Sequence, residues 1–371
     1  MNAYITSTGA FLPGPPVDND EIEDLLGLVH GRRSRLKTRI LKANGIRTRH
    51  YAIDKSGRTT HSNTAMAAAA ARQCLERAAI ARGAVGLLSC ATTQGDLVAP
   101  GIASMVQASI DLSDVEIIST HGICSCSLMA TKAAANSLQV GDHSIALVVV
   151  SELASRLFKH TRYEAAGGDK SVDFNAEFLR WMLSDGAGAL LLEDRPRGRS
   201  LRIDWIRSFS HADAYPVCMS VGSPSDPSDE RTWQDFATYA EAEAAGALLI
   251  RQDVRLLDNM VKVGVDGALR LIEEGVLDTR KLDHFLCHYS SHHFRSKIFD
   301  MLRMAGAAVP EEKWYTNLYE RGNTGCASIF IMLDEFLREN RARAGDTILC
   351  MVPESGRFNA AYMHLTMMES T

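Results

Sequence analysis

The fold is indicated by residues 141–152, which read Gly-Asp-His-Ser-Ile-Ala-Leu-Val-Val-Val-Ser-Glu, and by residues 345–355, which read Gly-Asp-Thr-Ile-Leu-Cys-Met-Val-Pro-Glu-Ser. Each segment is a Gly-Asp turn followed by an apolar run. Such continuous runs are typical of strands in a sheet that is covered on both faces. Because the second segment begins 204 residues after the first, the sequence predicts an internal duplication.

Two further pairs of segments repeat in the same order and at nearly the same offset. Residues 86–92 resemble residues 284–289, each as a short buried strand, with Cys90 and Cys287 at an offset of 197 residues. The Gly-Ile-Cys-Ser-Cys run that begins at Gly122 resembles the Gly-Asn-Thr-Gly-Cys run that begins at Gly322, 200 residues later. Three ordered matches at a nearly constant offset are hard to produce by chance.

Each half therefore reads as strand, helix, strand, helix, strand, which is the pattern of an α/β fold with layered sheets. The first half is expected to cover residues 1–196 and the second residues 197–371, because Pro and Gly residues follow the strand predicted at Gly188–Glu193. The helices are expected at Ser62–Ala81, Ser127–Gln139, Asp253–Glu274 and Ala327–Arg341.

The composition is that of an ordinary globular protein, with 46% hydrophobic and 23% charged residues, which excludes disordered and collagen-like chains. Apolar runs such as Ile145–Val150 are far shorter than the ~20 residues of a membrane-spanning helix. A net charge of −5 argues against general nucleic-acid binding. No secretory signal is visible, so the eight cysteines are expected to be reduced thiols and the protein cytoplasmic.

Charge is concentrated in two segments. No acidic residue lies between Leu25 and Ile53, and the basic residues there are Arg32, Arg33, Arg35, Lys37, Arg39, Lys42, Arg47 and Arg49. This positive segment could attract an anionic partner, and a solvated helix face explains the charge equally well. Residues 226–243 are acidic and read as an inserted loop followed by a helix.

A candidate nucleophile follows Gly122. A strand predicted at Glu116–Thr120 turns through this glycine and places Cys124 at the start of an Ala-rich helix. Backbone N–H groups and the helix dipole stabilise a thiolate there, so we expect the pKa of Cys124 to be lowered. A small buried thiol is one alternative. Metal binding by His121, Cys124 and Cys126 is a weaker alternative, because no second ligand pair lies nearby to complete a tetrahedral set.

Three further residues could complete a site around this thiol. His288 follows a buried strand, where α/β folds build sites, although a surface turn with several histidines is the plainer explanation. Asn323 opens the second-half helix as Cys124 opens the first, so the duplication would bring both to one cavity; an N-cap is the alternative. Gly356 could offer its backbone N–H to an oxyanion, and a plain turn is equally consistent.

Taken together, these motifs resemble those of the β-ketoacyl-acyl-carrier-protein synthase III (ketosynthase III) group of thiolase-fold condensing enzymes. The resemblance spans nearly the whole chain and covers Cys124-Ser125 with Ala130, then His288, Gly322-Asn323-Thr324 with Ala327-Ser328, Gly45–His50 and Ser184–Ala189. In the family, small residues lie six and ten positions after the nucleophile. Cys124 meets this pattern with Ala130 and Ala134, whereas Cys126 is followed by Lys132 and Asn136.

The chain also departs from the family pattern. The family's His-Gln-Ala-Asn run is replaced here by His288-Tyr289-Ser290-Ser291. The Trp and Arg that hold the coenzyme A nucleotide in the housekeeping enzymes correspond to Arg39 and Ala43. These differences resemble specialised members that form dialkylresorcinols and cyclohexanediones.

The resemblance implies a thiolase-like fold of two pseudo-symmetric βαβαβ halves in an α-β-α-β-α arrangement. It implies an acyltransferase in which Cys124 carries the acyl group and His288 and Asn323 stabilise the enolate of a malonyl or 3-oxoacyl thioester. The backbone N–H groups of Cys124 and Gly356 would form the oxyanion hole. The product would be a new carbon–carbon bond in fatty acid or polyketide-type biosynthesis.

The resemblance also implies partners. Acyl carrier proteins are acidic, so Arg32, Arg33, Arg35, Arg39 and Lys42 become a candidate surface for carrier protein or coenzyme A. A homodimer is expected, and acyl-CoA or acyl-carrier protein would be substrates, with no metal or other cofactor and no nucleic-acid or membrane partner. Two alternatives stay open: acyl transfer without decarboxylation, including hydrolysis, or a non-catalytic partner subunit of a ketosynthase heterodimer.

Overall fold

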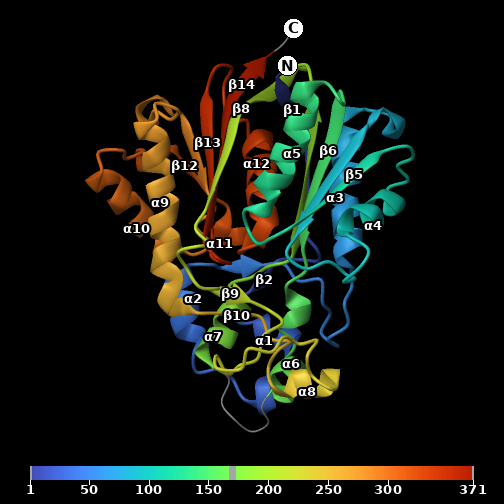
Figure 1. The fold of residues 1–371 in the computed structure, drawn as a ribbon, viewed down its shortest axis with the longest axis vertical. Helices are drawn as coiled ribbons and strands as arrows, with labels where there is room; N and C mark the ends of the chain where they lie inside the picture. The colour runs from blue at the N-terminus through green and yellow to red at the C-terminus, as the bar shows by residue number, and fades with distance from the viewer. Residues whose placement is uncertain (1, 167–172, 370–371) are drawn as a thin grey trace.

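The computed structural model describes residues 2–166 and 173–369, so Met1 and residues 370–371, at the outer ends of the two predicted halves, lie outside it. A ten-stranded sheet has the order β12-β11-β13-β14-β8-β1-β7-β6-β4-β5 (Figure 1). The first-half strands are β1 (Ala3–Phe11), β4 (Leu87–Thr92), β5 (Glu116–His121), β6 (Ile145–Glu152) and β7 (Gly186–Glu193). The second-half strands are β8 (Arg199–Ser210), β11 (His284–Cys287), β12 (Trp314–Tyr315), β13 (Thr347–Glu354) and β14 (Asn359–Glu369).

The two sets of strands have the same topology. In the first set, β4 is parallel to β5 and β6, and β7 is antiparallel to β6 and β1. In the second set, β11 is parallel to β12 and β13, and β14 is antiparallel to β13 and β8. Antiparallel pairing of β1 with β8 joins the sets. The division predicted at residue 196 falls in the connection from β7 to β8.

The helices form three layers around these strands, which confirms the predicted α-β-α-β-α arrangement. The central layer is α5 (Cys126–Val140) with α12 (Ser328–Arg338), which lie between the two sets of strands (Figure 1). One apolar core includes Leu128 of α5, Phe330 of α12, and strand residues from both halves. The outer layers are α3 (Asn63–Ala78) with α4 (Ile102–Ser109), and α9 (Leu257–Glu273) with α10 (His292–Met304).

Helices can pack closely on the strands because small residues lie at the contacts. A Cβ on Gly188 of β7 would lie 2.5 Å from the Cβ of Phe330 in α12. A Cβ on Gly9 of β1 would lie 2.3 Å from the backbone oxygen of Ala70 in α3. Any side chain at either glycine would therefore push a helix off the sheet.

The four helices expected from the sequence are confirmed as α3, α5, α9 and α12, with ends that differ by no more than four residues. The largest difference is at α9, where residues 254–256 form a 3₁₀ turn because the Asp253 side chain accepts a hydrogen bond from the Arg255 N–H. Helix α3 ends early because Ala79 is left-handed, with a φ of 52°. No helix within the described ranges is long and apolar enough to cross a membrane.

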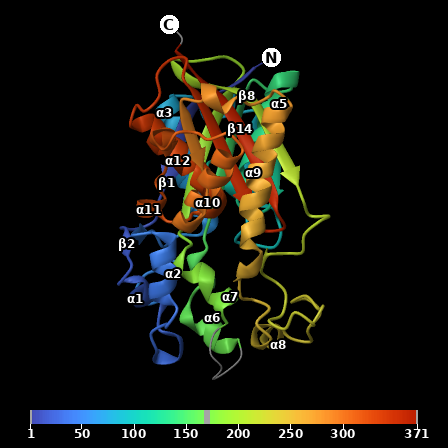
Figure 2. The same cartoon turned by 90° about the vertical axis from the view of Figure 1, so that its left-hand side faces the viewer.

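A second group of elements, the lower lobe, packs beneath the carboxyl ends of the parallel strands (Figure 2). Its short helix α8 (Tyr239–Ala244) confirms the helix expected after the acidic loop. The lobe is joined to the sheet through the buried Asp185 carboxylate, which accepts hydrogen bonds from the N–H groups of Ala52 and Ser155 at 2.7 and 2.9 Å. Its other elements are β2 (Val17–Asp18), α1 (Ile22–Leu26), α2 (Lys37–Asn44), β3 (Thr48–Arg49), α6 (His160–Ala165), α7 (Phe174–Glu177), β9 (Met219–Ser220) and β10 (Arg251–Gln252).

Candidate active site

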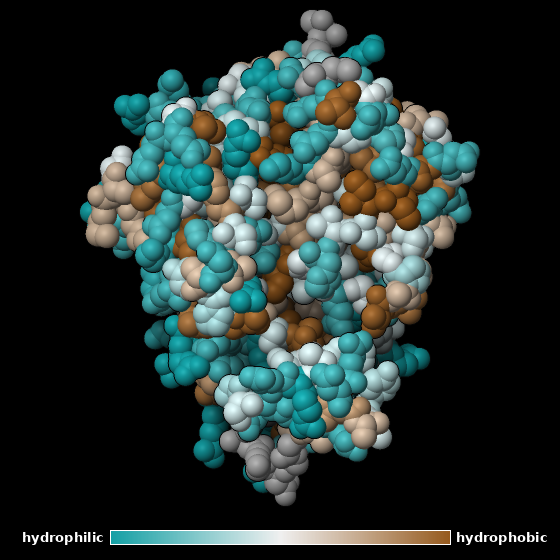
Figure 3. Space-filling view, viewed as in Figure 1, coloured by the Kyte–Doolittle hydropathy of each residue, from teal (hydrophilic) through white to brown (hydrophobic). Residues whose placement is uncertain are grey.

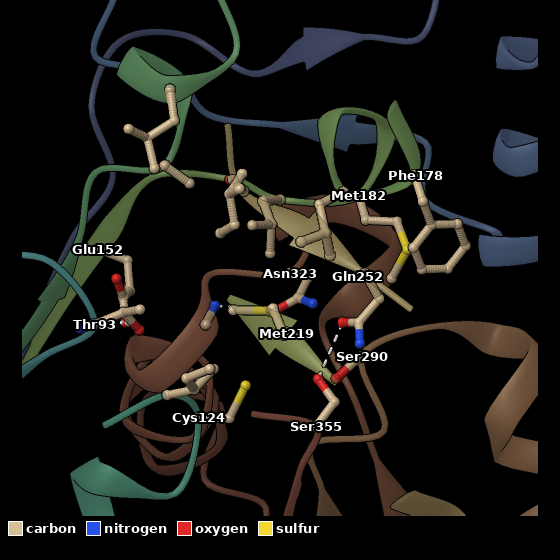
Figure 4. A pocket seen from close by; sticks show the side chains of 18 of the residues that line it. Thr93, Cys124, Glu152, Phe178, Met182, Met219, Gln252, Ser290, Asn323 and Ser355 are labelled. Atoms are coloured by element: carbon tan, nitrogen blue, oxygen red, sulfur yellow. Dashed lines mark hydrogen bonds between the residues drawn. The ribbon is translucent and has the colours of Figure 1, made fainter. Parts of the chain in front are cut away.

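Cys124 lies in the turn between β5 and α5. A Cβ on Gly122 would approach the Cβ of Cys126 to 2.9 Å, so the turn requires a residue without a side chain. The helix begins at Cys126, which leaves Cys124 two residues before it rather than in its first turn. The side chain is only 7% exposed, and its sulfur points into a cavity between the sheet and the lower lobe (Figure 4).

The cavity has an empty volume of about 790 Å³ and a mainly apolar wall. Most of that wall comes from the lower lobe, α9 and α10, through side chains such as Leu157, Phe178, Met182, Met219, Leu257 and Phe294. The polar side chains cluster near Cys124 and include Thr93, Glu152, Gln252, Ser290, Asn323 and Ser355 (Figure 4). On the face shown in Figure 3, apolar atoms are visible at the bottom of a recess between the sheet and the lower lobe.

Asn323 lines the same cavity as Cys124, as the duplication suggested. Its backbone N–H donates to the Met182 carbonyl at 3.2 Å, and its carbonyl accepts from the Ser184 N–H at 2.8 Å. Its side-chain oxygen accepts from the Gly325 N–H at 3.0 Å, at the start of the turn that leads into α12. The oxygen thus stabilises the turn, and the amide nitrogen is the part of the side chain left to donate to a ligand.

His288 follows β11 and is 3% exposed. It lines a smaller cavity of about 210 Å³ that adjoins the Cys124 cavity. The two cavities share one wall residue within the described chain, Ser290, whose hydroxyl lies 3.3 Å from His288 Nε2. Burial lowers the pKa of His288 to about 4, so the imidazole is neutral at physiological pH. His292 and His293 of the same cluster are exposed on α10.

The prediction of a lowered pKa at Cys124 is wrong. Burial raises the pKa of the thiol well above its ordinary value, and the nearby carboxyl groups of Glu354 and Glu152 raise it further. The helix N-terminus does not compensate, because Glu354 occupies the N–H groups there. Its carboxylate accepts from the Ser125 N–H at 2.9 Å and from the Ser125 hydroxyl at 2.6 Å, and it also accepts from the Ile123 N–H.

Glu354 is itself part of a buried network. The Asn359 side chain donates to the Ser125 hydroxyl oxygen at 2.8 Å, which orients the Ser125 O–H toward Glu354. Glu152, which also lies near Cys124, accepts hydrogen bonds from the Thr93 N–H and hydroxyl at 3.1 and 2.6 Å. Burial raises the pKa of both carboxyl groups. The turn that carries the thiol is therefore held in place by a carboxylate.

Gly356 lies against the nucleophile turn. A Cβ added to it would lie 2.7 Å from the Ile123 side chain, so only glycine permits this approach. Its carbonyl accepts hydrogen bonds from the N–H groups of Cys218 and Met219 at 2.9 and 3.2 Å. In the described part of the chain, the Gly356 N–H has no hydrogen-bond partner of its own. It remains a candidate oxyanion donor.

Cys126 has different surroundings from Cys124. It is 3% exposed, does not line the cavity, and is hydrogen-bonded to the buried thiol of Cys326. Within residues 2–166 and 173–369, no group of three or more His, Cys, Asp or Glu side chains could hold a metal ion. The structure therefore does not support the set of His121, Cys124 and Cys126 as metal ligands.

The basic segment divides into two groups. Lys37 pairs with Glu23 at 3.1 Å, and Arg49 is buried, where it donates to the Asn19 side chain at 2.8 Å. Arg47 pairs with Glu320. The others are exposed, and their side chains have no ion-pair or hydrogen-bond partner within the described chain. We call this group the basic face: Arg32, Arg33, Arg35, Arg39 and Lys42.

Sequence reasoning did not single out Glu152, Glu354 or Ser290 as site residues. Glu152 and Glu354 end the strands β6 and β13, which are equivalent in the two halves. The repeated segments that revealed the duplication contain both glutamates, so their placement near the pseudo-symmetric site could have been found from the sequence. Ser290 carried no such signal.

The fold and the cavity define a thiolase-fold protein. Solved structures align over nearly the whole chain. AbyA1, a tetronic acid condensing enzyme, aligns at a TM-score of 0.78 and 21% identity, and the alignment covers 98% of this chain and 99% of AbyA1. OleA from Xanthomonas campestris, with bound lauric acid and lauroyl-CoA, aligns at a TM-score of 0.76 and 19% identity over 99% of each chain. These likenesses establish the fold.

Sequence comparisons point to one group of enzymes within this fold. Residues 272–361 match the family model of the 3-oxoacyl-[acyl-carrier-protein] synthase III C terminal. A β-ketoacyl-[acyl-carrier-protein] synthase III from Hyphomonas neptunium is 26% identical over 348 residues, which cover 94% of each chain. One from Bordetella petrii is 25% identical over 94% of this chain and 93% of its own. The chain is thus similar over nearly its whole length to ketosynthase III enzymes, and residues 272–361 match the family model of their C-terminal part.

Proposed function

We propose that this protein is an acyltransferase of the β-ketoacyl-acyl-carrier-protein synthase III type, which loads an acyl group on Cys124 and condenses it with a malonyl or 3-oxoacyl thioester. One observation carries the proposal: the Cys124 sulfur and the Asn323 carboxamide open into the same apolar cavity. An aliphatic acyl chain on the sulfur would exchange water for contacts with the apolar wall, at about 0.8 kcal/mol per buried CH₂ group.

In the first step the Cys124 sulfur attacks the carbonyl carbon of an acyl thioester. The N–H groups of Cys124 and Gly356 would stabilise the tetrahedral oxyanion. The carbon–sulfur bond to the donor breaks, and the donor thiolate takes the proton that Cys124 gives up. A thiol with a raised pKa suits this exchange, because the proton need not leave before the donor has bound.

In the second step a malonyl thioester binds, its carboxylate leaves as carbon dioxide, and the electron pair becomes an enolate. The Asn323 amide can donate a hydrogen bond to that enolate, and a neutral imidazole at His288, in the adjoining cavity, supports this stabilisation without adding a charge. The enolate carbon attacks the acyl group on Cys124, the carbon–sulfur bond breaks, and the thiolate is reprotonated. Neither step changes an oxidation state, so we propose no redox cofactor.

An acidic carrier protein is the proposed donor of at least one thioester. The basic face lies on α2 and the segment before it, in the lower lobe that forms the cavity wall. Five exposed, unpaired cations close together in the chain attract an acidic partner and speed its association. Relatives in the family are named for acyl-carrier-protein substrates, which supports this assignment.

A homodimer is proposed on the basis of strand β5. This strand forms one edge of the sheet, and its side chains are largely exposed. Figure 3 shows a patch of apolar atoms on this side of the molecule, and Ile117 on β5 is 40% exposed. An exposed edge strand presents unpaired backbone N–H and C=O groups, so it is a ready site for pairing with a second chain.

The experiment that tests this function supplies an acyl thioester together with malonyl-CoA or malonyl-carrier protein labelled in the free carboxyl group. Condensation predicts labelled carbon dioxide in equal amount to a 3-oxoacyl product. Release of free acid, ester or amide without carbon dioxide would instead establish acyl transfer without decarboxylation. Failure of every donor to label the protein would favour a non-catalytic partner subunit.

A further inference from the structure

The wall between the two cavities is built around Ser290. The larger cavity holds Cys124 and Asn323, and the smaller one holds His288. Ser290 is the residue that lines both within the described part of the chain. The imidazole thus has a route to the Cys124 cavity through the Ser290 hydroxyl, which lies 3.3 Å from Nε2.

The backbone at Ser290 is unusual. Its φ is 61°, in the left-handed region that glycine adopts without strain and that other residues adopt at a cost of roughly 1–3 kcal/mol. The neighbouring backbone is tightly turned, since the Ser291 N–H donates to the Tyr289 carbonyl at 2.6 Å. A serine at this position therefore contributes a hydroxyl that a less strained glycine would lack.

The protonation state of His288 determines which way the hydrogen bond runs. A neutral imidazole carries one proton, on Nδ1 or on Nε2. If Nε2 carries the proton, it donates to Ser290 Oγ, and the Ser290 O–H is then free to donate into the cavity. This orientation gives the Cys124 cavity a hydroxyl donor supported by the imidazole behind it.

We infer that Ser290 is a catalytic residue of the condensation step, whose hydroxyl transmits the His288 hydrogen bond to the thioester oxygen of the second substrate. The inference rests on the proposed function and adds a residue to it. The Ser290 hydroxyl and the Asn323 amide form a pair of donors to one oxygen, and His288 acts through Ser290.

The chemistry balances without a proton transfer by Ser290. The bond between the malonyl methylene carbon and its carboxylate breaks, and its electron pair forms the enolate while carbon dioxide leaves. Ser290 and Asn323 keep their protons and only hydrogen-bond the enolate oxygen. The Cys124 thiolate released by condensation takes its proton from water. The hydroxyl thus acts by stabilising negative charge where it develops.

The test uses Ser290→Gly and Ser290→Ala in the full-length protein. Both variants remove the hydroxyl, and Ser290→Gly also removes the left-handed strain, so it should fold at least as stably as the wild type. The extent of acylation of Cys124, measured by intact-protein mass spectrometry, is expected to stay unchanged. Release of carbon dioxide from a malonyl thioester by the acylated protein should fall about 100-fold in both variants, as expected when one donor to an oxyanion is removed.

A double-mutant cycle with His288→Ala tests whether the two residues act together. If His288 acts through Ser290, the double variant should be no slower than His288→Ala alone. Losses that multiply, or a Ser290→Gly variant that condenses at the wild-type rate, would overturn the role of Ser290 while leaving the proposed function intact. A wild-type protein that acylates but never releases carbon dioxide would instead contradict the proposed function, and this role with it.

Discussion

The Glu354 carboxylate accepts two hydrogen bonds from Ser125, at 2.9 Å from its backbone N–H and 2.6 Å from its hydroxyl. These groups are next to Cys124, and they are the donors that a helix N-terminus would otherwise offer to a thiolate. Glu354 thereby fixes the turn that directs the sulfur and at the same time opposes ionisation of that sulfur. The nucleophile is held in place but kept protonated until a substrate arrives.

This relationship predicts the reactivity of the free thiol. Glu354→Gln removes a negative charge near Cys124, so the pKa of the thiol should fall, with about a tenfold gain in alkylation rate for each unit of that fall. The measurement is iodoacetamide labelling of the Cys124 peptide from pH 7 to pH 10, followed by mass spectrometry. Glu339→Gln, at an exposed position after α12, is the matched control. Unchanged or slower labelling of Cys124 in Glu354→Gln would show that the carboxylate does not oppose ionisation.

The burial of His288 predicts how stability depends on pH. Its pKa is about 4 in the folded protein and 6.5 in an unfolded chain, so the unfolded state binds the proton first. The contribution of neutral His288 to the free energy of unfolding is fully present above pH 6.5. It is lost as pH falls toward 4, which lowers the free energy of unfolding by about 3 kcal/mol in total. Urea unfolding at pH 7 and pH 4 should show the free energy of unfolding falling by that much more in the wild type than in His288→Gln. Equal losses in the two proteins would show that the imidazole is not buried in its neutral form.

The basic face predicts which donors depend on it. Arg33→Glu combined with Arg35→Glu should weaken the use of an acyl-carrier protein far more than the use of a small acyl thioester, because only the protein carries an extended acidic surface. Arg280→Glu with Arg341→Glu is the control, since these exposed residues lie before β11 and after α12, at the ends of those elements remote from the cavity. Steady-state kinetics with both donors provides the comparison. Equal losses for the two donors in the Arg33 and Arg35 variant would place carrier docking elsewhere.

The edge strand β5 predicts the oligomeric state. Ile117→Arg introduces a charge into the proposed strand-to-strand interface, so it should shift the protein from dimer to monomer in sedimentation velocity. Met304→Arg, at an exposed position at the end of α10, should leave the dimer intact. A wild-type protein that sediments as a monomer, or an Ile117→Arg protein that remains a dimer, would contradict pairing through β5.

Much of the fold could be predicted because the duplication is visible in the chain. The Gly-Asp turns at residues 141 and 345 each precede a buried strand, and the helices after Cys124 and Asn323 occupy the same place in each half. Equivalent segments in two related halves must meet at equivalent positions, which is why Cys124 and Asn323 could be assigned to one cavity. The exact helix ends depended on single capping side chains such as Asp253.

The electrostatics of the site could not be predicted in the same way. The prediction of a lowered pKa at Cys124 assumed that the N–H groups before α5 would be free. The sequence does not show that Glu354 reaches them from a strand 229 residues away. Likewise, His288 was assigned to the cavity by its place after β11, but the left-handed turn at Ser290 brings that hydroxyl, and not the imidazole, to the cavity wall. Both outcomes follow from long-range packing.

The most direct test of the account is a pulse of acyl donor followed by a malonyl donor, with intact-protein mass spectrometry at each stage. The wild type and Cys126→Ala should gain the mass of one acyl group and lose it again as the 3-oxoacyl product forms. Cys124→Ala should remain folded and gain no mass. A stable adduct on Cys124→Ala, or an adduct that disappears only with loss of Cys126, would contradict the assignment of Cys124 as the residue that carries the acyl group.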